Sequence, residues 1–248
     1  MSFIITVYIP EAIVMASDSR QSITVQRQQP DGTKLQAVET VSSDFVYKTF
    51  LLSQQGAGIS TFGESILGKV TIESHIKRFQ EEKLGDRDDI LSVPQKLLEF
   101  FREKFPNADT AFHVAGFKKE SKVSVPHVYH CQVSRNEMKR LNTKQGTGEV
   151  VYGASWGGQV DVIAGILTPS QLKGPDGNIQ QVVKAPVLWE TMPIQDAIDF
   201  AIYAVRTTID TIRFQARPKN VGGPIDVLLL TPEKVSWIKR KEYRGELQ

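Results

Sequence analysis

Short runs of β-branched and aromatic residues dominate the first part of the chain, which is typical of β-strands. Two such runs, residues 2–9 and 12–17, are separated by only two residues, and such a short connection favours an antiparallel hairpin. The polar residues 21–43, which contain a Pro-Asp-Gly turn signal, predict either two exposed strands or a surface excursion. Further strands are expected at residues 45–53 and 56–61.

Helical spacing of apolar residues follows, and it is clearest near the end of the chain. In residues 193–215 apolar side chains recur every three or four positions, so one long amphipathic helix is predicted. Other helices are expected from Ile66 to Phe79, at 94–105 with Ser92 as a candidate cap, and after Gly153. The remaining strands are expected at 110–117, 123–133, 137–142, 225–230 and 235–239.

The order of strands, two helices, strands, two helices and strands predicts an α+β fold with helices segregated from largely antiparallel sheets. A length of 248 residues permits one large domain or two small ones. No repeat, low-complexity tract or linker divides the sequence. We therefore expect a single domain over residues 1–248.

Composition and charge exclude several classes of protein. The 30 basic and 28 acidic residues give a net charge of only +2, which argues against a nucleic-acid partner held by a basic field. One cysteine excludes a disulfide framework and a cysteine-rich zinc site. The longest apolar run, residues 3–9, is far below the ~20 residues that cross a membrane. No positive charge precedes Arg20, so no secretory leader and a cytoplasmic location are expected.

Two sequence motifs resemble functional sites, but a structural role explains each of them better. Residues 63–70 nearly match a phosphate-binding loop, yet Val70 replaces the hydroxyl that binds magnesium, so a helix start is the preferred interpretation. His127, His130 and Cys131 bring two imidazoles near the only thiol. On a strand, however, adjacent side chains point to opposite faces, and residues 127 and 131 stand about 13 Å apart. We expect these three to be core or sheet-surface residues.

Three residues in the first part of the chain can support nucleophilic catalysis together. Removal of Met1 would expose Ser2 with a free α-amine, whose pKa of about 7.7–8.0 lets one residue supply both nucleophile and base. A hairpin of the first two strands would bring Asp18 to the same sheet end as Ser2. Lys48 has apolar neighbours and requires a partner if it is buried, for which Asp18 is the candidate.

The block from Ser2 to Arg20, followed by Lys48, resembles the start of proteasome-type β subunits, which are N-terminal nucleophile hydrolases. The resemblance maps the family's oxyanion-hole glycine to Gly63, and Ser155 is the candidate for the serine of its Gly-Ser-Gly segment. Segments around residues 192–201 and 222–231 resemble the family's long helix and closing strands. The chain departs from the family in four respects: a terminal Ser instead of Thr, no propeptide, a longer Asp18–Lys48 interval, and no clear match for the later Asp and Ser.

The resemblance implies a four-layer αββα sandwich and hydrolysis of an amide or peptide bond by Ser2. It assigns catalytic roles to Ser2, Asp18, Lys48, Gly63 and Ser155. This chemistry needs no cofactor, metal or nucleotide. The implied partners are a peptide or amide substrate and further copies of the chain in a homo-oligomeric ring. Two alternatives stay open: a non-catalytic assembly subunit of the same fold, and a small-amide hydrolase or amide-transferring enzyme.

Overall fold

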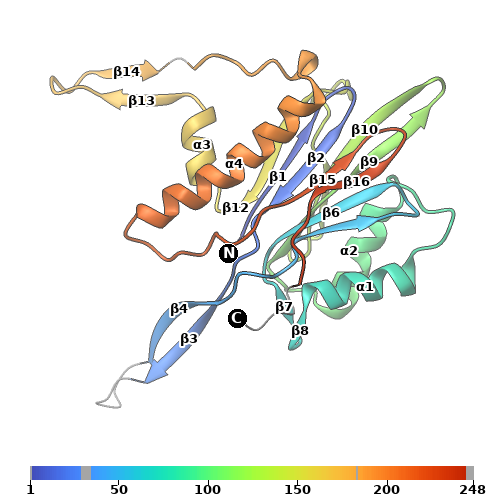
Figure 1. Cartoon of the computed structure of the whole chain (residues 1–248), viewed down its shortest axis with the longest axis horizontal. Helices are drawn as coiled ribbons and strands as arrows, with labels where there is room; N and C mark the ends of the chain where they lie inside the picture. The colour runs from blue at the N-terminus through green and yellow to red at the C-terminus, as the bar shows by residue number, and fades with distance from the viewer. Residues whose placement is uncertain (1, 29–34, 183, 244–248) are drawn as a thin grey trace.

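Two five-stranded antiparallel sheets form the centre of the computed structural model, which describes residues 2–28, 35–182 and 184–243 (Figure 1). The first sheet has the order β12-β1-β2-β15-β16. Its strands are β1 (Phe3–Tyr8), β2 (Ile13–Ser17), β12 (Gly153–Gly158), β15 (Asp226–Leu230) and β16 (Val235–Lys239). The second sheet has the order β11-β10-β9-β6-β5. Its strands are β5 (Thr49–Leu52), β6 (Ala57–Gly63), β9 (Thr110–Glu120), β10 (Val123–Gln132) and β11 (Glu137–Arg140).

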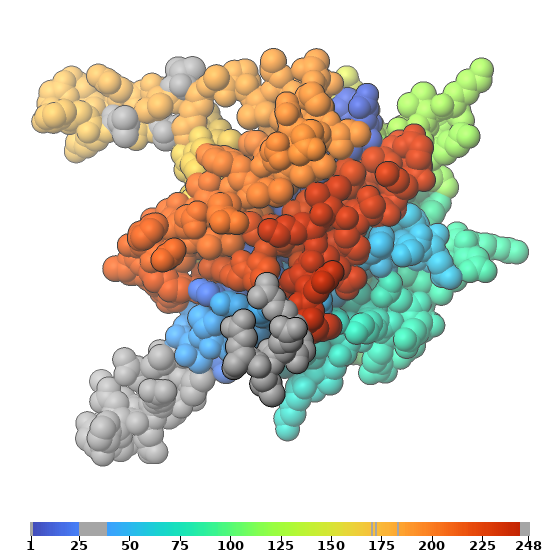
Figure 2. Space-filling view, in the orientation of Figure 1, coloured from blue at the N-terminus to red at the C-terminus, as the bar shows by residue number. Residues whose placement is uncertain are grey.

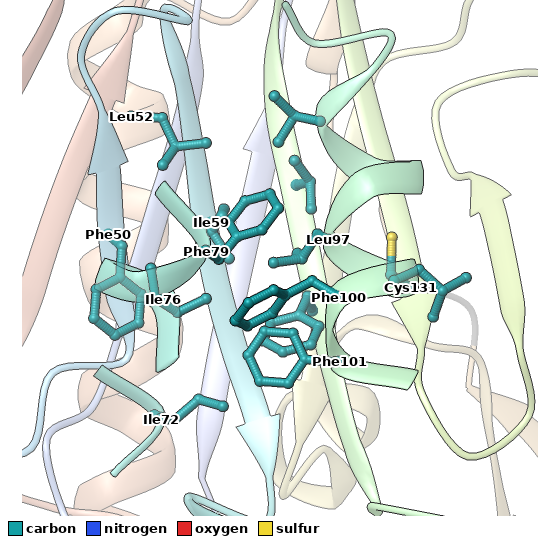
Figure 3. Close-up of a cluster of buried hydrophobic side chains, with 14 of the residues drawn as sticks. Phe50, Leu52, Ile59, Ile72, Ile76, Phe79, Leu97, Phe100, Phe101 and Cys131 are labelled. Carbon is teal, nitrogen blue, oxygen red and sulfur yellow. The ribbon is translucent and has the colours of Figure 1, made fainter. Parts of the chain in front are cut away.

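The four α-helices of the described chain pack in pairs, each pair against one sheet. Helices α1 (Ile72–Lys83) and α2 (Val93–Lys104) cover the second sheet, where aromatic side chains such as Phe79 and Phe101 pack around Ile59 (Figure 3). Helices α3 (Asp161–Leu167) and α4 (Ile194–Phe214) cover the first sheet. The mixed, mostly antiparallel architecture expected from the sequence is therefore confirmed.

A third apolar cluster lies between the two sheets. Tyr8, Met15 and Leu228 of the first sheet share this cluster with Ala115 and Val128 of the second. Every residue of β1 and β2 is buried, because helices cover one face of these strands and the second sheet covers the other. The first strands of the chain are consequently among the most completely enclosed elements, and the residues that border them are held in fixed positions.

Two hairpins extend from this body (Figure 1). Strands β3 (Gln21–Gln28) and β4 (Leu35–Ser43) pair only with each other, as do β13 (Ser170–Lys173) and β14 (Ile179–Val182). In the space-filling view the β13–β14 hairpin stands clear of the rest of the molecule (Figure 2). The first hairpin confirms one of the two predictions for the polar residues 21–43. The expected turn at residues 30–32 lies outside the described residues, and β13 and β14 were not predicted.

The helix expected from Ile66 onwards begins only at Ile72. Gly68 and Lys69 adopt left-handed conformations, with φ of 56° and 66°, and join β7 (Ile66–Leu67) to β8 (Val70–Thr71). A two-residue turn of this kind reverses the direction of the chain between two hairpin strands, and it cannot continue a helix. The region is therefore neither a phosphate loop nor a helix start, and apolar spacing alone was misleading there.

Two further boundaries near the candidate site differ from the prediction. Gly153–Gly158 forms β12, so the helix expected after Gly153 starts at Asp161. Lys48 was placed within a strand, but β5 begins one residue later, at Thr49. Ser92 does occupy the N-cap position of α2, although its hydroxyl binds the Asp88 carboxylate instead of capping the helix. A short 3₁₀ turn, η1 (Trp189–Thr191), precedes α4. Among the described helices none is both long and apolar enough to cross a membrane.

Candidate active site

The β1–β2 hairpin brings the beginning of β1 to the end of β2. Ile4 pairs with Ser17, and the Asp18 amide donates to the Phe3 carbonyl over 3.2 Å. The Phe3 amide in turn donates to Asp18 Oδ1 over 2.9 Å. On the other side of β1, the Gln159 amide donates to the Ser2 carbonyl over 2.7 Å. Ser2 is thereby fixed between β2 and β12, and the predicted proximity of Ser2 and Asp18 is confirmed.

Asp18 and Lys48 form a buried ion pair. The distance from Lys48 Nζ to Asp18 Oδ1 is 2.6 Å, and the two side chains are 3% and 0% exposed. Asp18 Oδ2 accepts hydrogen bonds from the amides of Arg20 and Gly222 over 3.1 and 3.0 Å. Counting the Phe3 amide, four donors surround this carboxylate, and their hydrogen bonds replace those to the water lost on burial.

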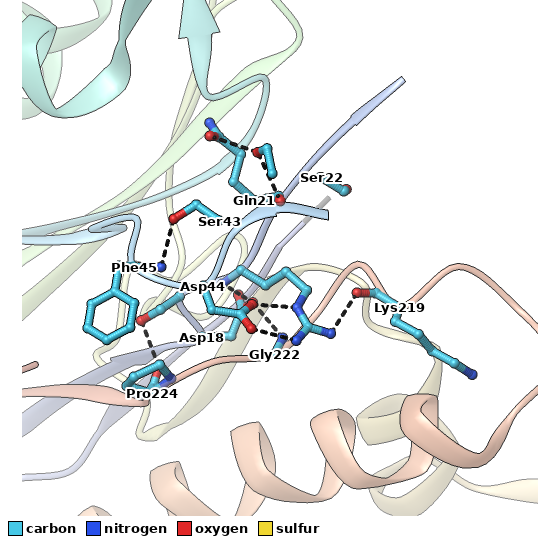
Figure 4. Close-up of polar contacts among 12 residues, drawn as sticks. Asp18, Gln21, Ser22, Ser43, Asp44, Phe45, Lys219, Gly222 and Pro224 are labelled. Atoms are coloured by element: carbon cyan, nitrogen blue, oxygen red, sulfur yellow. Dashed lines mark hydrogen bonds and ion pairs between the residues drawn. The ribbon is translucent and has the colours of Figure 1, made fainter. Parts of the chain in front are cut away.

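A second ion pair, which the sequence did not predict, fixes the loops around Asp18. Arg20 binds Asp44 through a fork, with Nε–Oδ1 and Nη2–Oδ2 distances of 2.6 and 2.8 Å. Arg20 Nη1 also donates to the Lys219 carbonyl over 3.1 Å. Figure 4 shows Asp18, Asp44 and Gly222 meeting at this junction. The fork raises the pKa of Arg20 and lowers that of Asp44, so both groups stay charged near neutral pH.

Burial makes Lys48 a weaker base than a lysine in water. Loss of hydration lowers the pKa of Lys48, because the charged ammonium is disfavoured in a buried site. The Asp18 carboxylate opposes this effect, whereas the positive charges of Lys241 and Arg20 lower the pKa of Lys48 further. The net direction is downward, so the Lys48 ammonium releases its proton at a lower pH than an exposed lysine does.

Ser2 lies where two cavities meet. One has a volume of about 580 Å³, and Arg20 and Lys48 are among its lining residues. The other has a volume of about 230 Å³ and is lined in part by Phe62 and Gly158. Ser2, Gly63 and Asp109 line both cavities. A bound chain could therefore extend to either side of the Ser2 hydroxyl, and the larger cavity falls within the roughly 300–1,000 Å³ typical of small-molecule sites.

Gly63 ends β6 at the edge of both cavities, in a conformation that favours glycine. Its φ is +93°, and a Cβ atom there would stand 2.1 Å from the Asp109 carbonyl oxygen. The neighbouring Glu64 amide donates to the same carbonyl over 2.8 Å, which holds the Asp109 backbone in place. The chain therefore approaches itself here more closely than any side chain would allow.

We expect Gly63→Ala to lower the free energy of unfolding by about 2–4 kcal/mol, through left-handed strain and the contact with Asp109. Gly56→Ala is the matched control, because Gly56 also has a positive φ, of 59°, but no atom lies near its Cβ position. That variant should cost only about 1–2 kcal/mol. Urea unfolding of both variants measures the difference, and equal losses would contradict the steric explanation.

Ser155 is not brought to this site. In the β1–β12 ladder Ser155 lies opposite Thr6, whereas Gly158 lies opposite Phe3 at the end next to Ser2. The Ser155 hydroxyl lies 3.1 Å from the Tyr8 hydroxyl, and Ser155 lines neither of the two cavities. Of the five residues implied by the resemblance, Ser2, Lys48 and Gly63 share a cavity and Asp18 binds Lys48, while Ser155 stands apart.

The histidine and cysteine cluster on β10 has the structural role expected from strand alternation. Cys131 packs in the cluster beneath α2, and burial raises the pKa of its thiol to about 12, so it stays protonated. His127 contacts the Tyr129 hydroxyl and the Glu120 carboxylate, and the His130 ring stacks on Phe62. Across the described residues, no group of three or more histidine, cysteine or acidic side chains is arranged to hold a metal.

Comparison with known proteins gives a relationship at the level of structure. No protein-family model and no curated protein sequence matches the chain. A solved structure of the Anbu (Gly-1) mutant from Hyphomicrobium sp. strain MC1 does match, with a TM-score of 0.59 over 97% of this chain and 86% of that one. The fold is proteasome-like. At 14% identity the likeness concerns the fold alone.

Proposed function

We propose that the chain is a hydrolase of amide or peptide bonds in which Ser2 is the nucleophile once Met1 is removed. The observation that carries this proposal is the position of Ser2 at the junction of two cavities, with the buried Asp18–Lys48 pair lining or bordering the larger one. The proteasome-like fold supports it. We assign the two sheets and their helix pairs to the four-layer αββα sandwich of N-terminal nucleophile hydrolases.

In the proposed reaction, Ser2 Oγ attacks the substrate carbonyl and forms a C–O bond. Lys48 relays the hydroxyl proton to the α-amine of Ser2, which the lowered pKa of Lys48 favours. Asp18 holds the Lys48 Nζ in place. The C–N bond of the substrate then breaks, and its amine leaves with that proton. Water attacks the Ser2 ester, the ester C–O bond breaks, and the acid is released while Ser2 Oγ regains a proton. All atoms balance without a metal, a cofactor or a redox step.

We further propose that the backbone N–H of Gly63 stabilises the oxyanion that forms during attack. Gly63 lines both cavities beside Ser2, and its conformation brings its backbone to the cavity edge without a side chain. A donor of this kind typically contributes about 3–4 kcal/mol to the stability of the transition state. Ser155 has no part in this mechanism, because it lines neither cavity.

The test is intact-mass analysis before and after treatment with a β-lactone, which traps serine nucleophiles as esters. We expect the mass of the untreated chain to lack Met1 and the treated chain to gain the mass of one lactone. Digestion should place the adduct on Ser2. Ser155→Ala is the matched control, since it removes another serine hydroxyl of the same sheet, and it should be labelled at the wild-type rate.

A chain that keeps Met1, or an adduct at another residue, would show that Ser2 is not the nucleophile. An unlabelled chain would favour the non-catalytic assembly subunit. If Ser2 is labelled, turnover of peptides against small amides separates a peptidase from a small-amide hydrolase or transferase. A homo-oligomeric ring remains part of the proposal on the strength of the family resemblance, and a cytoplasmic location because the single cysteine fits a reducing compartment.

A further inference from the structure

The ion pair between Asp226 and Lys241 is also buried, and it lies beside the Asp18–Lys48 pair. Lys241 Nζ contacts the Asp226 carboxylate, and the two side chains are 2% and 0% exposed. The Lys241 amide also donates to Asp226 Oδ1 over 2.8 Å, so main chain and side chain of Lys241 bind one carboxylate. Asp226 begins β15 directly opposite Ser17, the residue before Asp18. The two buried pairs are therefore anchored on neighbouring positions of neighbouring strands.

Tyr47 connects this second pair to Lys48 from the other side. Its hydroxyl donates to the Lys241 carbonyl over 3.1 Å, and Lys241 Nζ lies 4.1 Å from the centroid of its ring. The Tyr243 ring meets Tyr47 edge-on, with centroids 5.9 Å apart. Residues 240–243 are thus fastened onto the residue that precedes Lys48. Lys241 is joined through Asp226 to the strand before Asp18, and through Tyr47 to the segment that carries Lys48.

We propose that Lys241 is a positioning residue for Lys48. Lys241 touches neither cavity, so it acts through Tyr47 and through its charge. This inference rests on the proposed function, in which Lys48 relays the Ser2 proton. Its structural basis is that Lys241 contacts Asp226 and Tyr47, the neighbours of the two residues that form the Asp18–Lys48 pair.

The stability of the fold does not require the Asp226–Lys241 pair to be charged. Taking an ammonium and a carboxylate out of water is costly, and apolar residues of similar volume often hold such a position as well or better. The tyrosine contacts and the β15–β16 pairing already fasten residues 240–243 in place. What an apolar pair could not supply is a positive charge next to Lys48. The charge of Lys241 is therefore the property to test.

The charged groups around Lys48 determine how its pKa changes when the charge of Lys241 is removed. Asp18 raises the pKa of Lys48, whereas Lys241 and Arg20 lower it. Asp44 is held by Arg20, and Asp226 by Lys241. Removing the charge of Lys241 consequently raises the pKa of Lys48. Since a proton relay requires the neutral amine, activity at low pH should fall while activity at high pH is retained.

The experiment compares Lys241→Met with two further variants of the full chain. Lys239→Met is the matched control, because it removes an exposed lysine two residues earlier on β16. The double variant Asp226→Asn/Lys241→Met leaves no buried carboxylate without its partner, so it tests the effect of the lost lysine charge even if the single variant folds poorly. The rate of β-lactone labelling of Ser2 is measured against pH. Independently, the Lys48 side chain is titrated by NMR with ¹³C-labelled lysine, the signal being assigned with Lys48→Met.

For Lys241→Met we expect the rate of labelling to fall at low pH by up to about tenfold, the loss to shrink as the pH rises, and the Lys48 titration to move to higher pH. The double variant should shift in the same direction by less, because Asp226 no longer adds a negative charge. Lys239→Met should match the wild type. Equal pH profiles and equal Lys48 titrations in Lys241→Met and Lys239→Met would overturn the inference. If the wild type is not labelled at Ser2, the proposed function fails, and the Lys48 titration still decides the inference.

Discussion

Ser2→Ala should lower turnover of any amide substrate by at least about 10³-fold and abolish β-lactone labelling, because it removes the attacking oxygen. The same change should leave the free energy of unfolding within about 1 kcal/mol of the wild type. The Ser2 hydroxyl makes no hydrogen bond within the described residues, and the contacts that fix Ser2 come from its backbone carbonyl. Loss of activity with retained stability would therefore be specific to the chemistry.

Turnover is measured with the wild type, Ser2→Ala and Ser155→Ala under the same conditions, and unfolding is followed in urea. Ser155→Ala keeps the terminal nucleophile and should retain activity within about twofold. Residual labelling of Ser2→Ala at the wild-type rate would place the nucleophile elsewhere. A large loss of stability in Ser2→Ala would mean that the hydroxyl has a structural role that its contacts do not reveal.

Lys48→Met should reduce turnover by about 10²–10⁴-fold, the usual contribution of a positioned proton-transfer group. It should also destabilise the fold, because breaking a buried ion pair leaves a charge without its partner, at a typical cost of about 3–5 kcal/mol. We expect the low end of that range here. The amides of Phe3, Arg20 and Gly222 still donate to the Asp18 carboxylate after the lysine is removed.

Lys77→Met is the matched control for this variant. Lys77 also binds a carboxylate, Glu73, over 2.9 Å, but its side chain is 64% exposed. Surface pairs of this kind contribute only about 0.3–0.5 kcal/mol, so its removal should change neither turnover nor unfolding by a measurable amount. An active Lys48→Met enzyme would limit Lys48 to a structural role and would leave proton transfer to the α-amine of Ser2 alone.

Local pattern was sufficient to predict much of the site. The two apolar runs separated by two residues implied a hairpin, and the hairpin placed Ser2 beside Asp18. The apolar neighbours of Lys48 implied burial, and burial implied a carboxylate partner, which the structure shows to be Asp18. These predictions succeeded because a strand pair converts sequence spacing directly into distance.

Other features could not be predicted from spacing. Arg20 binds Asp44 across the β3–β4 hairpin, Asp18 accepts from the distant Gly222 amide, and Lys241 meets Asp226. Each of these contacts joins segments whose proximity depends on how the sheet is ordered. The helix expected from Ile66 failed for a different reason. Its apolar spacing fits a helix, but the left-handed turn at Gly68 and Lys69 makes a small hairpin instead.

By itself, the sequence determined most strands of the two central sheets, the long helix α4 and a nucleophile candidate at the start of the first buried strand. These follow from periodicity and residue type, which act over a few neighbouring positions. Only the tertiary structure decided which candidates belong together. Strand order placed Ser155 away from Ser2 and brought the Asp226–Lys241 pair up to the Asp18–Lys48 pair, because a sheet joins residues by register and not by their separation along the chain.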